Sequence, residues 1–247
     1  MSDWPHGVNR ITLEVVDSTM AEARRRASDI TAPTWIHALT QTAGTGRRGR
    51  AWDTGKGNFS ASLLMRPVAP PPQMALRSFV AALALYDALV ATTGRADIFT
   101  LKWPNDVLLR GGKLAGILLE TVPDGLIIGI GVNLKTLPPA AILEPHAVAP
   151  KTLLAETGVA IQPEAFLEAL APALARREEQ MATYGFEPIR ANWLKHAANL
   201  GQAVRAQVGN QAIRGTFTTL DENGALVLQT AQGLREISAG DVHFEGG

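Results

Sequence analysis

The 247-residue sequence contains no cysteine. This absence excludes disulfide bonds, thiolate zinc sites and cysteine nucleophiles, and it fits a reducing cytoplasm, where we expect the protein to act. A charge surplus is also lacking, because Lys and Arg together number 23 and Asp and Glu together number 23. Since dedicated nucleic-acid-binding proteins usually carry a basic excess, we expect no nucleic-acid partner.

Long apolar segments are scarce as well. The first ten residues, MSDWPHGVNR, have no apolar core and do not form a signal peptide. The longest apolar run, FVAALALYDALVA, is interrupted by Asp87 and is too short to span a bilayer, so no membrane partner is expected. The length of the chain is ordinary for one large domain, or for one domain with a small appendage.

The hydrophobic pattern up to residue 198 predicts an α+β domain. The predicted strands cover residues 35–41, 58–65, 97–103, 107–120 and 126–134, and the fourth of these ranges is a hairpin that turns at Arg110-Gly111-Gly112. Helices are predicted in DSTMAEARRRA from residue 17, where Thr19 and Glu22 form a capping box, over 74–93, and in three stretches of 151–198. We expect a mostly antiparallel or mixed sheet with helices packed on it.

The pattern changes after Asn199. Short strand-like runs (AVRAQV, AIRGTFTTL, ALVLQ and LREISAGDVHF) alternate with Gly-Asn, Asn-Gly and Gln-Gly turns, as is typical of a small β-barrel. We therefore predict a main domain at 1–198 and a barrel at 199–247. The Pro- and Ala-rich residues 135–150 are predicted to form a loop.

The glycine- and arginine-rich segment 42–60, TAGTGRRGRAWDTGKGNFS, has the appearance of two nucleotide-binding motifs. A dinucleotide-binding fingerprint requires a helix after its glycines and an acidic residue further on, but this segment leads into a strand. A Walker phosphate loop requires four residues between its glycines and Ser or Thr after its lysine, and Lys56 is followed by Gly57. Neither motif is therefore present.

What remains is a glycine-rich loop that brings three guanidinium groups together, from Arg47, Arg48 and Arg50. Guanidinium groups suit phosphate and carboxylate ligands, although a solvated surface loop would have the same composition. A strand that starts with Lys113 and contains Gly116 favours a ligand site, because a glycine within a strand allows close approach.

Four motifs, DST, QTAGTGRRGRAW, KWPNDVLLRGGKLAGILLE and IGIGVN, occur in the order and spacing of the biotin protein ligases. The resemblance covers about residues 14–134, and the C-terminal barrel agrees with it. It implies a class II aminoacyl-tRNA-synthetase-like biotin/lipoate ligase fold with an SH3-like C-terminal barrel. Because the motifs begin by residue 17, the chain is similar to the short form that lacks an N-terminal DNA-binding domain, and we expect no specific DNA binding.

The implied activity uses ATP and Mg²⁺ to convert biotin into biotinyl-5′-AMP, and then transfers biotin to a lysine of a biotin carboxyl carrier domain. Two anions, a carboxylate and an α-phosphate, must meet, so fixed cations are needed. By resemblance Arg47 and Lys113 supply most of that stabilisation and Lys102 assists toward the phosphates. Asp106 is either the base that receives the proton of the acceptor lysine or a turn aspartate.

The resemblance also implies two sets of binding residues. The biotin-binding set is Ser18, Thr19, Gln41, Thr45, Gly46, Arg47, Lys113, Gly116 and Gly131. The ATP- or adenylate-binding set is Arg48, Arg50, Trp52, Asn105 and Asn133. Ser18 and Thr19 could equally be helix caps, or could serve both purposes.

The sequence departs from the family pattern at two positions. Thr45 stands where the family usually has Arg, and Met20 stands where it has Asn, which removes a guanidinium from the loop and a polar contact near biotin. A lipoate or octanoate ligase or transferase of the same fold, and a non-catalytic biotin or adenylate sensor, are the alternatives. An exposed sheet edge could form a homodimer or dock the carrier.

Overall fold

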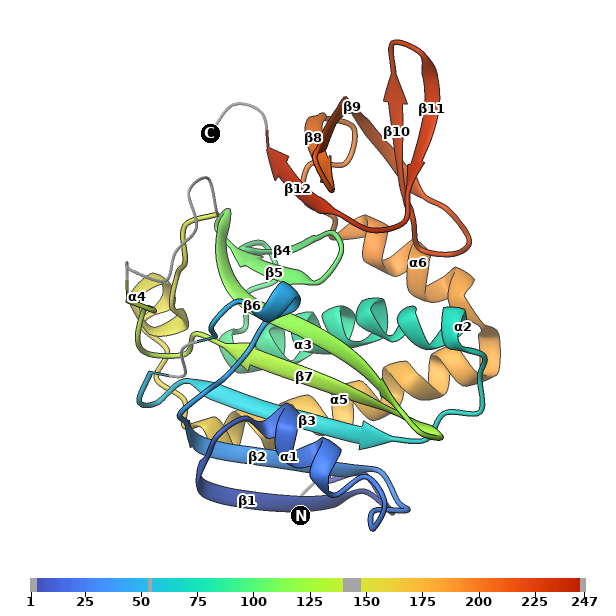
Figure 1. The fold of residues 1–247 in the computed structure, drawn as a ribbon. Coiled ribbons are helices and arrows are strands. Elements are labelled where there is room, and N and C mark those ends of the chain that lie inside the picture. The colour runs from blue at the N-terminus through green and yellow to red at the C-terminus, as the bar shows by residue number, and fades with distance from the viewer. Residues whose placement is uncertain (1–3, 53–54, 140–147, 245–247) are drawn as a thin grey trace.

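The computed structural model describes residues 4–52, 55–139 and 148–244, which form two sheets and the helices that pack on them (Figure 1). The larger sheet has seven strands in the order β1-β2-β3-β7-β6-β5-β4. These strands are β1 (Asn9–Val16), β2 (Thr34–Gln41), β3 (Phe59–Met65), β4 (Phe99–Lys102), β5 (Asp106–Leu109), β6 (Gly112–Val122) and β7 (Gly125–Val132). Only β1 and β2 pair in parallel, so the mostly antiparallel or mixed sheet is confirmed.

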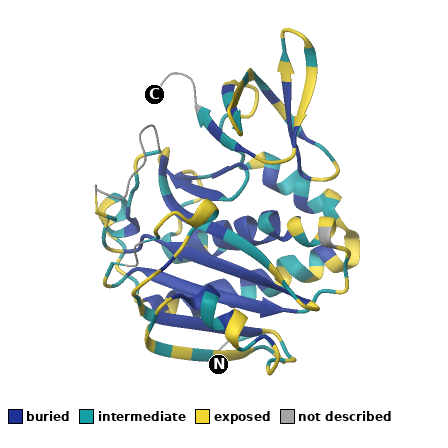
Figure 2. Cartoon of the chain, in the orientation of Figure 1, coloured by how far each residue is buried: buried dark blue, intermediate teal, exposed yellow. Residues whose placement is uncertain are grey.

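Helices cover both faces of this sheet. The helices are α1 (Thr19–Arg25), α2 (Pro71–Ala75), α3 (Arg77–Thr93), α4 (Leu153–Thr157), α5 (Pro163–Tyr184) and α6 (Phe186–Lys195), and a 3-10 turn, η1, spans Arg47–Gly49. The main core lies between the sheet and the helices α3, α5 and α6, where β3 and β7 are buried along their whole length (Figure 2). A second, small apolar core lies on the opposite face beneath α1.

The apolar run FVAALALYDALVA lies within a longer helical segment, Pro72–Thr93. By length and composition alone it could cross a membrane, contrary to the expectation from the sequence. However, 72% of its most apolar window is buried inside the protein, as is usual for a core helix. Leu76 separates α2 from α3 within the range that was predicted as one helix.

The C-terminal sheet has five antiparallel strands in the order β11-β10-β9-β8-β12. They are β8 (Ala203–Val208), β9 (Gln211–Leu220), β10 (Leu226–Thr230), β11 (Gly233–Ile237) and β12 (Asp241–Phe244). This agrees with the expected small SH3-like barrel, while the exact division at residue 199 stays a prediction. The run LREISAGDVHF, expected as one strand, is divided into β11 and β12.

One strand was missed from the sequence, and one predicted helix cap was wrong. Strand β1 was not predicted; it is an exposed edge strand whose only strand neighbour in the described residues is β2. Thr19 is not the helix cap, because Ser18 is the extended N-cap residue and its hydroxyl accepts a hydrogen bond from the Ala21 amide at 3.5 Å. Of the predicted loop at 135–150, residues 140–147 lie outside the described part of the chain.

Candidate functional site

A cavity of about 190 Å³ lies on the face of the larger sheet that carries α1. Its walls come from the start of α1, from β2, β3, β5, β6 and β7, from the loop that follows β2, and from one residue of the C-terminal sheet, Asp241. The predicted site residues that line it are Ser18, Thr19, Gln41, Thr45, Gly46, Arg47, Arg50, Trp52, Asn105, Asp106, Lys113, Gly116, Gly131 and Asn133. Two predicted residues, Arg48 and Lys102, lie outside the wall.

One end of the cavity is polar but uncharged. Gln41 Oε1 accepts a hydrogen bond from the Thr19 amide at 2.7 Å, and Gln41 Nε2 donates to Ser60 Oγ at 3.3 Å. Ser62 Oγ, fully buried below, donates to Thr19 Oγ1 at 2.8 Å. These contacts fix the directions of the Gln41 amide and the Thr19 hydroxyl before any ligand binds. Ser60 was not among the predicted residues, although its alternation in β3 places it on this face.

The glycines of β6 and β7 allow an indole ring to lie directly on the sheet. A Cβ atom on Gly131 would lie 2.3 Å from the Trp52 ring, and one on Gly116 would lie 3.3 Å from it. These two glycines pair across β6 and β7. Larger residues here would displace Trp52, so the close approach expected at Gly116 is present and the approaching group is Trp52.

The loop that carries the arginines folds back on itself. The Gly46 amide donates to the Arg50 carbonyl at 2.7 Å, and the Trp52 amide donates to the Gly44 carbonyl at 2.8 Å. Arg48 has a φ of 57°, a left-handed conformation that turns the loop. The loop thereby holds three guanidinium groups beside the cavity, and Thr45, which lines the wall, forms an isolated bridge with Ala51.

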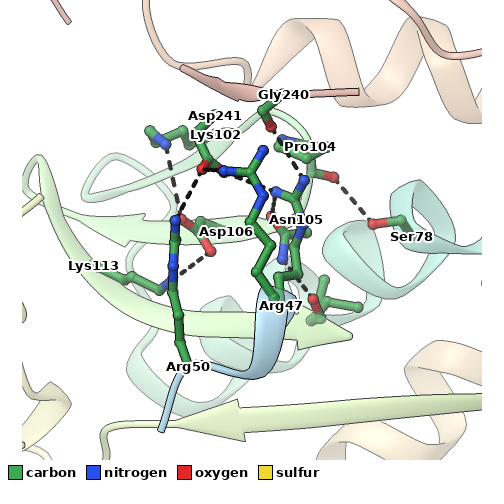
Figure 3. A network of polar contacts seen from close by, with 12 residues as sticks. Arg47, Arg50, Ser78, Lys102, Pro104, Asn105, Asp106, Lys113, Gly240 and Asp241 are labelled. Carbon is green, nitrogen blue, oxygen red and sulfur yellow. Dashed lines mark hydrogen bonds and ion pairs between the residues drawn. The ribbon is translucent and has the colours of Figure 1, made fainter. Parts of the chain in front are cut away.

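All three arginines reach one carboxylate of the C-terminal sheet. Figure 3 shows this carboxylate, Asp241, together with Arg47 and Arg50. Asp241 lies 3.2 Å from Arg47, 2.9 Å from Arg48 and 3.1 Å from Arg50. Burial would raise the pKa of Asp241, but the three guanidinium groups outweigh it and hold that pKa below its ordinary value. The sequence carried no signal for Asp241, because its contacts join segments nearly 200 residues apart.

The other two cations are Lys102, at the end of β4, and Lys113, near the start of β6. Asp106 lies between two lysines, with Oδ1 2.8 Å from Lys113 Nζ and Oδ2 3.9 Å from Lys102 Nζ. Lys102 is only 8% exposed, and burial lowers its pKa despite the nearby Asp106. Lys102 therefore lies behind Asp106 rather than on the cavity wall, and any effect it has on a ligand is indirect.

Two asparagines fix the backbone around Lys113. Asn105 accepts a hydrogen bond from Arg47 at 3.2 Å and donates to the Ile117 carbonyl at 2.6 Å. Asn133, 3% exposed, donates to the Lys113 carbonyl at 3.4 Å. Both were predicted as ATP contacts; in this structure each lines the cavity and also holds β6 in place.

Comparison with known proteins gives matches along nearly the whole chain. Residues 12–135 match the biotin/lipoate A/B protein ligase family, and residues 200–244 match the biotin protein ligase C-terminal domain. A biotin–[acetyl-CoA-carboxylase] ligase of Paracoccus denitrificans is 48% identical over 93% of this chain and 98% of its own length. A bifunctional ligase/repressor of Bacillus subtilis is 31% identical over 96% of this chain and 74% of its own length.

Solved structures agree with these matches. The biotin protein ligase from Aquifex aeolicus in complex with biotin and ATP superposes with a TM-score of 0.84, at 29% identity, over 95% of this chain and 97% of that one. The apo structure of the Aquifex aeolicus enzyme superposes with a TM-score of 0.79, at 26% identity, over 95% and 98% of the two chains. This chain belongs to the biotin protein ligase family.

Proposed function

We propose that this protein activates biotin with ATP, forming biotinyl-5′-AMP and pyrophosphate, and transfers biotin to a lysine of the biotin carboxyl carrier protein of acetyl-CoA carboxylase. The observation that carries the proposal is one cavity with two unlike ends, an uncharged hydrogen-bonding end at Thr19 and Gln41 and a cationic end at Arg47 and Lys113. Biotin has the matching polarity, with a neutral ureido ring at one end and a carboxylate at the other.

The adenylation step requires a carboxylate to attack an α-phosphate, and the repulsion between the two anions must be offset. Arg47 and Lys113 both line the cavity and contact adjacent residues: Arg47 donates to Asn105, and Lys113 pairs with Asp106. Burial lowers the pKa of Arg47 from its ordinary value, against the opposing effect of Asp241. Preorganised cations in a partly closed site stabilise developing negative charge without reorganising solvent, and we assign this role to these two residues. Arg48 and Arg50 are assigned to the phosphates.

Mg²⁺ would accompany ATP as the complex with the triphosphate. Within the described residues there is no group of three His, Asp or Glu side chains that could hold a metal ion. Asp106 and Asp241 already face cations. These residues fit an ion held mainly by substrate phosphates, as Mg²⁺ often is, rather than a resident protein site.

The transfer step requires the acceptor lysine to lose a proton before it attacks the adenylate. Asp106 lines the cavity, and its carboxylate lies beside Lys113 on the side of the cavity formed by the β5–β6 hairpin. We therefore propose Asp106 as the group that orients and deprotonates the acceptor amine.

We further propose that the protein acts in the cytoplasm and without specific DNA binding, which its zero formal charge supports. Homodimer formation or carrier docking could use either of two sheet edges. One is β1; the other is residues 118–122 of β6, whose only strand neighbour in the described chain is β7. A gel shift with biotin-operon DNA, biotin and ATP should show no specific complex, and a tight one would contradict this part of the proposal.

One incubation tests the main proposal. The protein is mixed with ATP, Mg²⁺ and a biotin carboxyl carrier domain, with biotin in one sample and lipoate in the other, and the carrier is weighed by mass spectrometry. We expect a mass gain with biotin only, dependent on ATP. A gain with lipoate would instead identify a lipoate ligase, and bound adenylate with no transfer would identify a sensor.

A further inference from the structure

Met20 closes the uncharged end of the cavity. It is the second residue of α1, lines the cavity beside Thr19, and is only 5% exposed. A Cβ atom on Gly129 would lie 2.5 Å from Met20 Sδ and 2.9 Å from its Cγ. The thioether therefore rests directly on the backbone of β7, in space that only a glycine leaves open.

Behind Met20 the cavity does not end in solvent but in the small second core. Met20 belongs to this core together with Ala23, Ala27, Ile36, Leu64 and Ile127. Leu118 packs against the same core and also lines the cavity. Met20 is thus the partition between a ligand cavity and an apolar core, and shortening its side chain would extend the cavity toward that core.

The walls at this end differ in polarity. Thr19, Gln41 and Ser60 form a connected set of hydrogen-bonding groups, whereas Met20, Leu118 and Ile130 present apolar atoms. A bicyclic ring with a ureido edge and a thioether edge fits such walls in one orientation, with the ureido edge on the polar wall. The sulfur edge then lies against the apolar wall, where no hydrogen-bonding side chain is provided.

From this arrangement we propose that Met20 determines specificity at the sulfur edge of the biotin ring. The inference rests on the proposed function and adds to it which part of the biotin ring Met20 contacts. A ring that carries oxygen atoms on its sulfur is disfavoured for two reasons. The oxygens would need the space of Met20 Sδ, and they would be buried without hydrogen-bond donors. A thioether is large and adaptable enough to close the wall around the smaller, unoxidised ring.

Biotin sulfone, which bears two oxygens on the ring sulfur, is the direct probe. In the wild-type protein we expect kcat/KM for ATP-dependent pyrophosphate release to favour biotin over the sulfone by at least about tenfold, the effect of small steric differences in apolar pockets. Met20→Ala should reduce this preference about tenfold by opening space. Met20→Leu, which keeps the bulk and removes the sulfur, should largely retain it.

Met181→Ala is the matched control. Met181 is 8% exposed, so it is buried to nearly the same extent as Met20, but it lies in α5 on the other face of the sheet. Its truncation should therefore lower stability without changing the preference for biotin over the sulfone. An unchanged preference in a folded Met20→Ala protein would overturn the inference. If that variant does not fold, equal wild-type kcat/KM values for biotin and the sulfone would overturn it as well. Absence of pyrophosphate release with biotin itself would instead contradict the proposed function.

Discussion

The two ends of the cavity are built in opposite ways. The uncharged end is assembled from adjacent strands and the start of α1, with Thr19, Gln41 and Ser62 joined by short hydrogen bonds. The charged end is assembled from a loop, a hairpin and the second sheet, which meet at Arg47, Lys113 and Asp241. A neutral ring can be recognised by dipoles that a single sheet holds in place, whereas concentrated positive charge requires segments from across the chain.

The difference has an electrostatic reason. Hydroxyl and amide groups satisfy one another inside the sheet and leave little net field. Guanidinium groups held close together repel one another, and here a single carboxylate, Asp241, faces all three of them. Binding at the uncharged end should therefore change little with pH and salt. Binding at the charged end should depend on the Asp241 carboxylate and on the charge of the ligand.

The largest expected effect follows from removing a cation at the charged end. Arg47→Ala or Lys113→Ala should lower the rate of biotinyl-AMP formation by about 1000-fold, because each removes a preorganised charge from the transition state. The rate is measured as biotin-dependent pyrophosphate release, and binding of biotinamide, which has no carboxylate, should change little. Arg235→Ala, an exposed arginine on β11, serves as control. A near-normal rate in either site variant would contradict the role assigned to that residue in stabilising the transition state.

At the uncharged end the expected loss is smaller and falls on binding. Thr19→Val removes the hydroxyl that faces the cavity and leaves the buried Ser62 hydroxyl without its acceptor. The Ser62 penalty falls on stability in both the free and the bound protein, whereas a ring group that loses the Thr19 hydroxyl as its partner is unsatisfied only in the complex; at about 1–3 kcal/mol for such a group, the Kd for biotin should rise roughly 10- to 100-fold. Isothermal titration calorimetry measures this, with the exposed Thr12→Val on β1 as control. If the Kd for biotinamide stays unchanged, Thr19 does not serve the ring.

Removing the Asp241 carboxylate should have a smaller effect than the loss of the Thr19 hydroxyl. Asp241→Asn keeps the shape of the side chain but leaves the three guanidinium groups without their shared carboxylate. The loop 44–52 should then open more often, so trypsin should cleave it several-fold faster and adenylate formation should fall several-fold. Glu236→Gln on the exposed strand β11 is the control. Equal cleavage rates for Asp241→Asn and wild type would show that Asp241 does not hold the loop.

The parts of the fold that local patterns encode were predictable. The hairpin at 107–120 follows from two apolar runs around Arg110-Gly111, and both residues have the positive φ values, 47° and 79°, that such a tight turn uses. Segment 42–60 could be rejected as a dinucleotide-binding motif because a strand follows it, and as a Walker motif because Gly57, not Ser or Thr, follows Lys56. Fourteen of the named site residues line one cavity, which family motifs, rather than periodicity, made predictable.

What the sequence left open depends on contacts between distant segments. Strand β1 is half exposed, and its pairing with β2 depends on the fold around it rather than on its own composition. Asp241 resembles any turn aspartate until the C-terminal sheet places it among the arginines. Likewise, the contact of Met20 with Gly129 requires the register of β7 beneath α1 to be known.

The smallest expected effect concerns pH and separates the two ends most directly. Burial lowers the pKa of Lys102 from 10.5, so Lys102 loses its proton, and the charged end loses a positive charge, at a lower pH than an exposed lysine would. We expect kcat/KM for ATP to fall a few-fold on the alkaline side, and Lys102→Arg to move this decline to higher pH, because guanidinium stays charged. The uncharged end has no titrating side chain among Ser18, Thr19 and Gln41. The Kd for biotinamide should therefore stay constant over the same pH range. If that Kd rises in parallel with the fall in kcat/KM for ATP, the charge of Lys102 affects both ends of the cavity, and the proposed separation is wrong.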